Sequence, residues 1–141
     1  MARVSTYLNF PGTAEEAFSF YKGLFGTDLV GPFVRFSDMP SEGGPELSAE
    51  DADKIMHAEL EIPGGHVLMA TDLLASMGQQ CRVGNNTTIF LELDDRADVD
   101  AYFAGLSEGG SDQSAPAMMP WGQYWGVVLD RYGIRWMLAA P

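Results

Sequence analysis

Cysteine is almost absent from this sequence of 141 residues, which contains only Cys81. One cysteine excludes an intramolecular disulfide framework, and it cannot form a cysteine-based zinc site by itself. Cys81 follows Gln79 and Gln80 with no histidine nearby in the sequence, so we do not expect a nucleophile there. A chain without disulfides fits a cytoplasmic location.

Basic residues are also few: eight Lys and Arg stand against 20 Asp and Glu, which gives a formal net charge of −12. Such a surface repels phosphate backbones and argues against a nucleic-acid partner. Apart from a mild cluster at 42–53, the acidic residues are spread along the chain, as is typical of a solvated surface. The net charge says little about a ligand, because a binding site can differ in sign from the surface around it.

Long apolar runs are missing as well. The longest apolar stretch, 67–74, is far too short to cross a bilayer, and no apolar segment of a secretory signal follows Arg3. The composition is nevertheless 46% hydrophobic, which is enough to bury a core. We therefore expect one soluble, cytoplasmic domain with no membrane partner.

The first half of the chain contains one helical pattern among several strand patterns. Ala14–Phe25 has apolar residues at helical spacing, with a capping box predicted from Thr13 and Glu16 and a helix end at Gly26. Strand patterns occupy 4–10, 28–36, 55–62 and 66–70, and a tight turn at 63–65 joins the last two, with His66 at the hairpin end. The acidic stretch 37–53 is predicted to be a mobile surface loop, and whether it closes over a site stays open.

The second half repeats this order. Strand patterns at 87–93, 114–119, 124–129 and 134–138 accompany one helix, which begins near Asp94 and Asp95 and ends at 109–110. The segment "DRYG" at 130–133 is predicted to be the last turn. The order strand–helix–three strands therefore occurs twice, in modules of about 1–74 and about 86–141 with a linker of about 75–85.

Several segments resemble one known family. They are "YLNFPGTAEEAFSFYKGLFG" (7–26), "KIMHAELEI" (54–62) with Asp72 soon after, "WGQYWG" (121–126) and "LDRYGIRWML" (129–138). In this order, over nearly the whole chain, they resemble the vicinal oxygen chelate superfamily (glyoxalase, bleomycin resistance, dioxygenase), in its PhnB-like branch. The resemblance implies an α+β fold in which two βαβββ modules form a curved mixed sheet around a cavity, and it implies a homodimer.

The resemblance also implies where a metal would bind in the metal-dependent members. The four corresponding strand positions come out near Ser5, Met69, Thr88 and Met137, none of which is a competent ligand for a hard or borderline divalent ion. A shift of each position by two residues recovers Glu92 but no full set. We therefore expect no metal site of the usual kind and no cofactor, although a divalent ion held by a non-standard set stays open.

The strand "MHAELEI" at 56–62 is the first candidate site. Alternation places its apolar residues on one face, under the helix, and sends His57 and Glu59 to the other face, towards the cavity. The same reasoning sends Glu92 of the second module towards the cavity. His57 has three interpretations: a residue that contacts the ligand and acts as general base, a metal ligand with Glu59 or Glu92, or part of a solvated strand face.

Aromatic residues gather near the end of the chain and supply the second candidate site. We expect Trp121 and Trp125 to line the cavity together with Tyr7 from the first strand, and Trp136 to lie in the core. Arg135 is either a fixed cation of the cavity, able to bind a carboxylate or phosphonate bidentately, or a solvated surface residue.

These residues favour a protein that binds a small molecule whose identity the sequence does not name. The alternative is a metal-dependent or metal-free lyase, isomerase or dioxygenase of the same superfamily that uses His57. PhnB-like proteins are sometimes labelled methyltransferases, but the sequence has no Gly-rich strand-to-helix turn that would hold a nucleotide-like cofactor.

Overall fold

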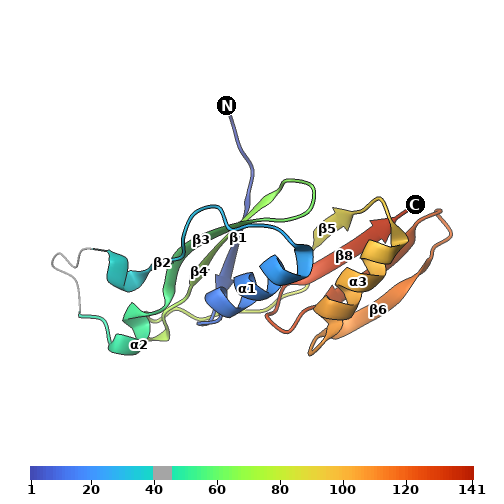
Figure 1. Cartoon of the computed structure of the whole chain (residues 1–141). Coiled ribbons are helices and arrows are strands. Elements are labelled where there is room, and N and C mark those ends of the chain that lie inside the picture. The colour runs from blue at the N-terminus through green and yellow to red at the C-terminus, as the bar shows by residue number, and fades with distance from the viewer. Residues whose placement is uncertain (40–45) are drawn as a thin grey trace. The chain divides into compact units, whose positions relative to one another are not determined.

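The computed structural model describes residues 1–39 and 46–141 of the chain. These form two compact units, Met1–Cys81 and Arg82–Pro141, and each is described by itself (Figure 1). Within the described ranges, no helix is long and apolar enough to cross a membrane.

The first unit is a four-stranded mixed sheet with one long helix. Its strands and helices are β1 (Thr6–Phe10), α1 (Ala14–Phe25), β2 (Val34–Arg35), the 3₁₀ helix η1 (Phe36–Asp38), α2 (Ala49–Ala52), β3 (Ile55–Glu61), β4 (Val67–Asp72) and the 3₁₀ helix η2 (Ala75–Met77). The strand order is β1-β4-β3-β2. β1 runs parallel to β4, whereas the β3–β4 and β2–β3 pairs are antiparallel.

The core of this unit lies between α1 and one face of the sheet. Phe18 and Tyr21 of α1 are completely buried, and so are Phe10 and Leu60 of the strands. The Phe10 and Phe18 rings meet edge to face with centroids 6.2 Å apart. Burial of each such side chain contributes roughly 1.5–3 kcal/mol, so this apolar stripe of α1 fixes which face of the sheet the helix covers.

The ends of α1 differ in how well the sequence predicts them. Gly26 ends the helix in the left-handed conformation, at φ 65°, as predicted. The predicted capping box at the start is wrong, because the Thr13 side chain makes no capping hydrogen bond. The backbone N–H of Ala14 instead donates to Oδ1 of Asp72, at the end of β4, over 2.9 Å. A residue 58 positions away therefore replaces the local cap.

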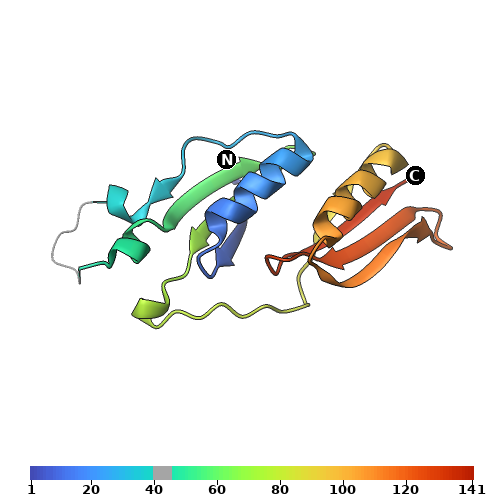
Figure 2. The ribbon, with the colours of Figure 1, turned by 60° about the horizontal axis from the view of Figure 1, so that its bottom comes forward.

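The second unit repeats the topology of the first. It contains β5 (Ile89–Glu92), α3 (Arg96–Ser107), β6 (Ser111–Met118), β7 (Tyr124–Leu129) and β8 (Arg135–Ala140), in the sheet order β5-β8-β7-β6. Again the first strand runs parallel to the last, and the other neighbours are antiparallel. Figure 2 shows α3 over one face of this sheet. The α+β fold of two βαβββ modules is thereby confirmed.

Two predicted segments differ from the structure. The strand expected over 28–36 is reduced to an isolated bridge between Leu29 and Leu60 and the two-residue β2, because Gly31 adopts φ 82° and Pro32 has no N–H for a strand ladder. The loop expected over 37–53 contains part of η1 and the whole of α2. The segment 40–45, on which part of the predicted mobile loop falls, lies outside the described residues.

Candidate functional site

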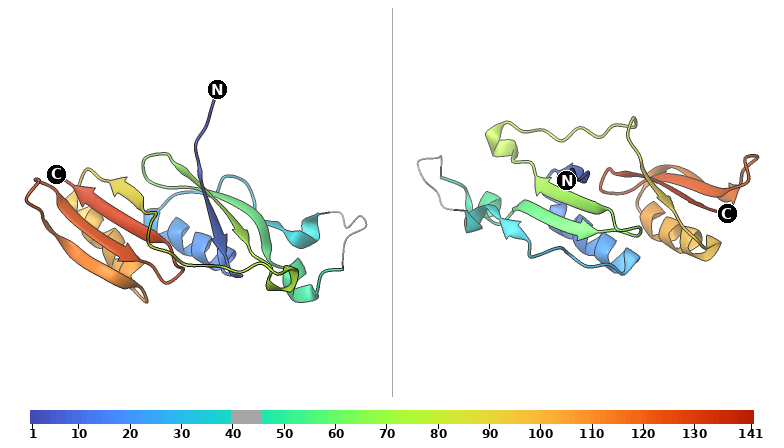
Figure 3. Two further views of the ribbon diagram at one scale, coloured as in Figure 1. Left: turned by 180° about the vertical axis from the view of Figure 1, so that it is seen from behind. Right: turned by 90° about the horizontal axis from the view of Figure 1, so that it is seen from above.

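Each sheet has one face that its own helix does not cover (Figure 3). Strand register places the candidate residues on these faces. In the first unit, Ala58, Leu60 and Ile62 are buried on the helix side, as the alternation predicts. The residues between them, His57 and Glu59, therefore lie on the helix-free face. Tyr7 joins them from β1, since both Tyr7 and Glu59 are paired with Met69 of β4.

His57 lies between two polar groups on this face. Its Nδ1 is 3.4 Å from the Tyr7 hydroxyl, and its Nε2 is 3.6 Å from Oε1 of Glu59. The same Oε1 is 3.5 Å from Nη2 of Arg3. With the imidazole proton on Nε2, the Tyr7 O–H donates to Nδ1 while Nε2–H is directed to Glu59, an assignment made from the hydrogen-bond network. The distances are at or beyond the upper end of hydrogen bonding, so the imidazole can exchange either partner for a ligand atom.

The helix-free face of the second unit carries aromatic and polar side chains together. Tyr124 donates its hydroxyl hydrogen to Asp100 of α3, so its neighbour Trp125 points to the opposite, helix-free side. The Trp125 ring meets the Trp121 ring edge to face, with centroids 6.0 Å apart. Trp121 is 61% exposed. Large exposed aromatic rings of this kind are typical of a surface that another molecule covers.

A side chain that the sequence analysis missed connects Glu92 to these rings. The indole N–H of Trp121 donates to Oε1 of Gln123 over 3.1 Å, and Nε2 of Gln123 lies 3.5 Å from Oε2 of Glu92. Gln123 lies inside the quoted motif "WGQYWG", but a single polar residue in a turn gives no local signal of such a role. The structure thus brings Glu92, Trp121 and Trp125 together.

Arg135 and Trp136 lie on opposite faces of β8. Trp136 is completely buried, and its indole N–H donates to Oδ2 of Asp130 over 2.9 Å, so its prediction as a core residue is confirmed. Arg135 is half-buried on the helix-free face, and its Nε is buried without a hydrogen-bond partner in the part of the chain that the structure describes. The seven candidate residues therefore divide between the units: Tyr7, His57 and Glu59 in the first, and Glu92, Trp121, Trp125 and Arg135 in the second.

The four residues near which the resemblance places the metal positions do not fit a hard divalent cation. Ser5, Met69, Thr88 and Met137 offer hydroxyl and thioether groups, whereas such a site needs carboxylate or imidazole. Over residues 1–39 and 46–141, no three or more His, Cys, Asp or Glu side chains are grouped to hold a metal ion.

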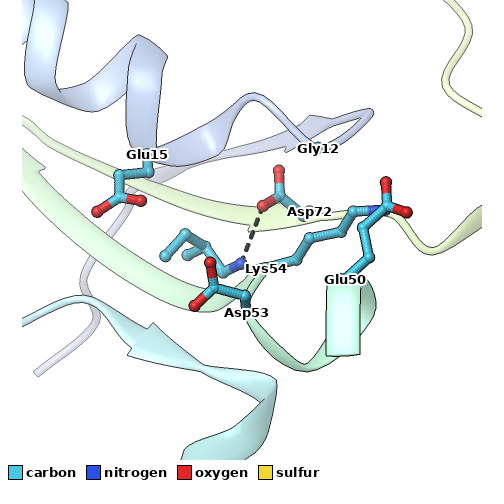
Figure 4. Close-up of a pocket in the computed structure, with 7 residues that line it drawn as sticks. Gly12, Glu15, Glu50, Asp53, Lys54 and Asp72 are labelled. Carbon is cyan, nitrogen blue, oxygen red and sulfur yellow. Dashed lines mark hydrogen bonds between the residues drawn. The ribbon is translucent and has the colours of Figure 1, made fainter. Parts of the chain in front are cut away.

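A cavity of about 260 Å³ lies near the start of α1 (Figure 4). Its lining is mostly acidic and consists of Gly12, Glu15, Glu50, Asp53, Lys54, Ile55 and Asp72. Asp72 is occupied by structural hydrogen bonds, because Oδ1 accepts from Ala14 N–H and Oδ2 accepts from Ile55 N–H, each over 2.9 Å.

Two further carboxylates in or next to this cavity, Glu15 and Asp51, are paired as well. Arg35 donates to both carboxylate oxygens of Glu15, over 2.7 and 3.2 Å, and these bonds lower the pKa of Glu15. Asp51 accepts from the Ser76 hydroxyl over 2.5 Å and from Lys54 over 3.1 Å, and these bonds, the one from Ser76 first, lower the pKa of Asp51. We interpret this cavity as a structural junction of α1, α2, β3 and β4.

Comparison with known proteins agrees with the fold. The protein YjdN of Escherichia coli (strain K12) is 24% identical over 143 residues, which cover 96% of this chain and 92% of YjdN. The crystal structure of protein PA1353 from Pseudomonas aeruginosa has a TM-score of 0.82 and 32% identity, covering 99% of this chain and 98% of that one.

A PhnB protein from Bacillus cereus, described as a putative 3-demethylubiquinone-9 3-methyltransferase, has a TM-score of 0.78. Its identity is 23%, over 99% of this chain and 100% of that one, so this likeness concerns the fold alone. Residues 4–138 match the profile of a single superfamily, as the quoted motifs predicted. The chain belongs to the Glyoxalase/Bleomycin resistance protein/Dioxygenase superfamily.

Proposed function

We propose that this protein binds a small molecule on the helix-free faces of its sheets, without the usual metal site of the superfamily. One observation carries the proposal: large aromatic side chains on or beside these faces are left exposed, at 49% for Tyr7, 45% for Phe90 and 61% for Trp121. Exposed rings beside a few polar groups are typical of small-molecule sites, which are mostly apolar with a few groups that fix orientation. His57, Glu59 and Glu92 supply such groups.

The test is elemental analysis of protein purified without a chelator or a His tag, together with native mass spectrometry. We expect no stoichiometric divalent ion and a co-purified organic mass, or an organic compound from a screen that raises the melting temperature. A stoichiometric ion that is lost on His57→Ala would contradict the proposal, and it would indicate a metal site around His57 and Glu59. A protein that binds neither a metal nor any screened compound would contradict small-molecule binding.

A second candidate is catalysis of the lyase, isomerase or dioxygenase type with His57 as general base. It is favoured by the contacts of the imidazole, which has a hydroxyl near one nitrogen and a carboxylate near the other. Such an arrangement favours one tautomer and suits an imidazole that transfers a proton. The side chain of His57 is 34% exposed, so a substrate atom can reach it.

A further inference from the structure

Resting on the proposed function, a further inference concerns the chemical class of the ligand. We infer that the helix-free face of β5, β7 and β8 binds a monocarboxylate with an apolar body, its carboxylate on Arg135 and its other end directed towards Glu92. The charge and register of this face within the second unit carry the inference.

The face is ordered in three rows across the strands. Arg135 of β8 is paired with Leu129 of β7, Met137 with both Phe90 and Val127, and Ala139 with both Glu92 and Trp125. Arg135 and Ala139 are four residues apart on one strand, which corresponds to about 13 Å. The first row therefore ends in a cation, the middle row is apolar, and the third row has a carboxylate on one side of Ala139 and an indole ring on the other.

Arg135 has a property expected of an anion-binding group. Its Nε is buried without a hydrogen-bond partner, and no carboxylate of the described ranges forms an ion pair with it, although the chain has 20 acidic residues. Leaving a buried N–H of a guanidinium without an acceptor is costly. A ligand carboxylate can accept two parallel bonds from the planar guanidinium, and a turn of the Arg135 side chain that brings the enclosed Nε into this contact would relieve that cost.

The middle row suits an apolar body of the ligand. Phe90 is 45% exposed, which is high for a ring on a sheet, and Val127, on the other side of Met137, is buried. A ring or alkyl chain that covers Phe90 and Met137 would remove this apolar surface from water. The expected gain in binding free energy comes from contact between the ligand and the middle row, and it does not depend on the charge of the ligand.

Glu92 determines which chemical group is preferred at the end of the ligand that lies away from Arg135. It is exposed, and its Oε2 lies 3.5 Å from the side-chain nitrogen of Gln123. A second anionic group on the ligand would come close to this carboxylate and be repelled, whereas a neutral or donor group would be tolerated. The face therefore favours a monocarboxylate over a dicarboxylate of the same shape.

The test uses three matched probes on the full chain in isothermal titration calorimetry: 4-phenylbutyrate, the neutral 4-phenylbutanamide, and the dicarboxylate 4-(4-carboxyphenyl)butyrate. We expect the monocarboxylate to bind about tenfold more tightly than either of the others, as one charge-assisted contact implies. Arg135→Gln should abolish the difference between acid and amide, and Arg135→Lys should keep part of it. Glu92→Gln should restore binding of the dicarboxylate.

The control variant is Arg82→Gln, which removes the same charge at an exposed position outside the face. Equal affinity of the unaltered protein for acid and amide would overturn the inference and leave small-molecule binding standing, and this comparison needs no variant to fold. An equal loss in Arg82→Gln and Arg135→Gln would also overturn it, because the effect would then be one of net charge. Absence of 4-phenylbutyrate binding at about 1 mM would overturn the inference too. Whether the protein binds other small molecules is tested separately, by the compound screen described for the proposed function.

Discussion

Asp72 caps helix α1 from a distant strand: its Oδ1 accepts the backbone N–H of Ala14 over 2.9 Å. Asp72 is 3% exposed, and its other oxygen accepts the N–H of Ile55 at the start of β3. Figure 4 shows this carboxylate between the two segments. One side chain at the end of β4 thus fixes both the start of the helix and the start of the neighbouring strand.

Replacing this carboxylate should destabilise the first unit. Asp72→Ala leaves two buried N–H groups without an acceptor, which costs about 3 kcal/mol in the free energy of unfolding. Asp72→Asn keeps one acceptor oxygen and should cost about half as much. Urea unfolding followed by circular dichroism measures both, with the exposed Asp28→Ala as the matched control. A loss for Asp72→Ala as small as that of the control would refute the capping role.

Asp51 should make stability depend on acid pH. Hydrogen bonds from Ser76 and then Lys54 lower the pKa of Asp51 below its ordinary value of 3.8. A carboxyl whose pKa is lowered by folding stabilises the protein fully above its unfolded pKa, and this contribution is lost as the pH falls through the folded value. The stability difference between the unaltered protein and Asp51→Asn should therefore be largest at pH 7 and shrink as the pH falls below the ordinary value of 3.8.

Unfolding by urea at a series of pH values checks this expectation. Asp28→Asn, at an exposed position, is the control for a general effect of net charge. A difference between the unaltered protein and Asp51→Asn that stays constant from pH 7 to about pH 3 would show that the Ser76 and Lys54 contacts do not act through the charge of Asp51.

Trp136 and Trp121 should respond differently to the same substitution. Trp136→Phe removes a buried indole and the N–H that donates to Asp130, so we expect a loss of about 2–3 kcal/mol. Trp121→Phe at the exposed hairpin should change the free energy of unfolding by less than about 0.5 kcal/mol. Comparable losses in the two variants, measured by chemical denaturation, would argue against the assignment of Trp136 to the core.

His57→Gln distinguishes catalysis from binding. If His57 is the general base, the variant should lose turnover of any substrate found by screening while ligand binding survives, because the amide keeps polar contacts but does not accept the proton. A rate assay measures the turnover, and a binding titration on the same protein measures the affinity for the ligand. Glu61→Gln on the same strand is the control, since Glu61 is exposed. Unchanged turnover would remove His57 from the mechanism.

The homodimer is a proposal that rests on the superfamily and on the exposed aromatic side chains. The mass of one chain is 15.3 kDa. We expect equilibrium sedimentation at micromolar concentrations to give twice this mass. A monomer mass throughout that range would end the proposal. The probe experiments on the second unit do not depend on the outcome.

The sequence by itself determined the repeated order of elements. The bounds of α1 at 14–25 and of β7 at 124–129 follow from periodicity, because a period of 3.6 or 2 is set by residues close together in the chain. The burial of Ala58 and Leu60 opposite His57 was predicted in the same way. The motifs then indicated the superfamily that residues 4–138 match.

Tertiary structure decided the contacts between distant segments. The cap on α1 comes from Asp72 and not from Thr13, and Gln123 connects Glu92 to Trp121. In the described residues, the Nε of Arg135 is buried without a hydrogen-bond partner, and this could not be read from the sequence, in which Arg135 is equally compatible with a solvated surface. Each of these depends on strand register and on helix position, which bring together groups far apart in sequence, and a local pattern contains no information about such pairs.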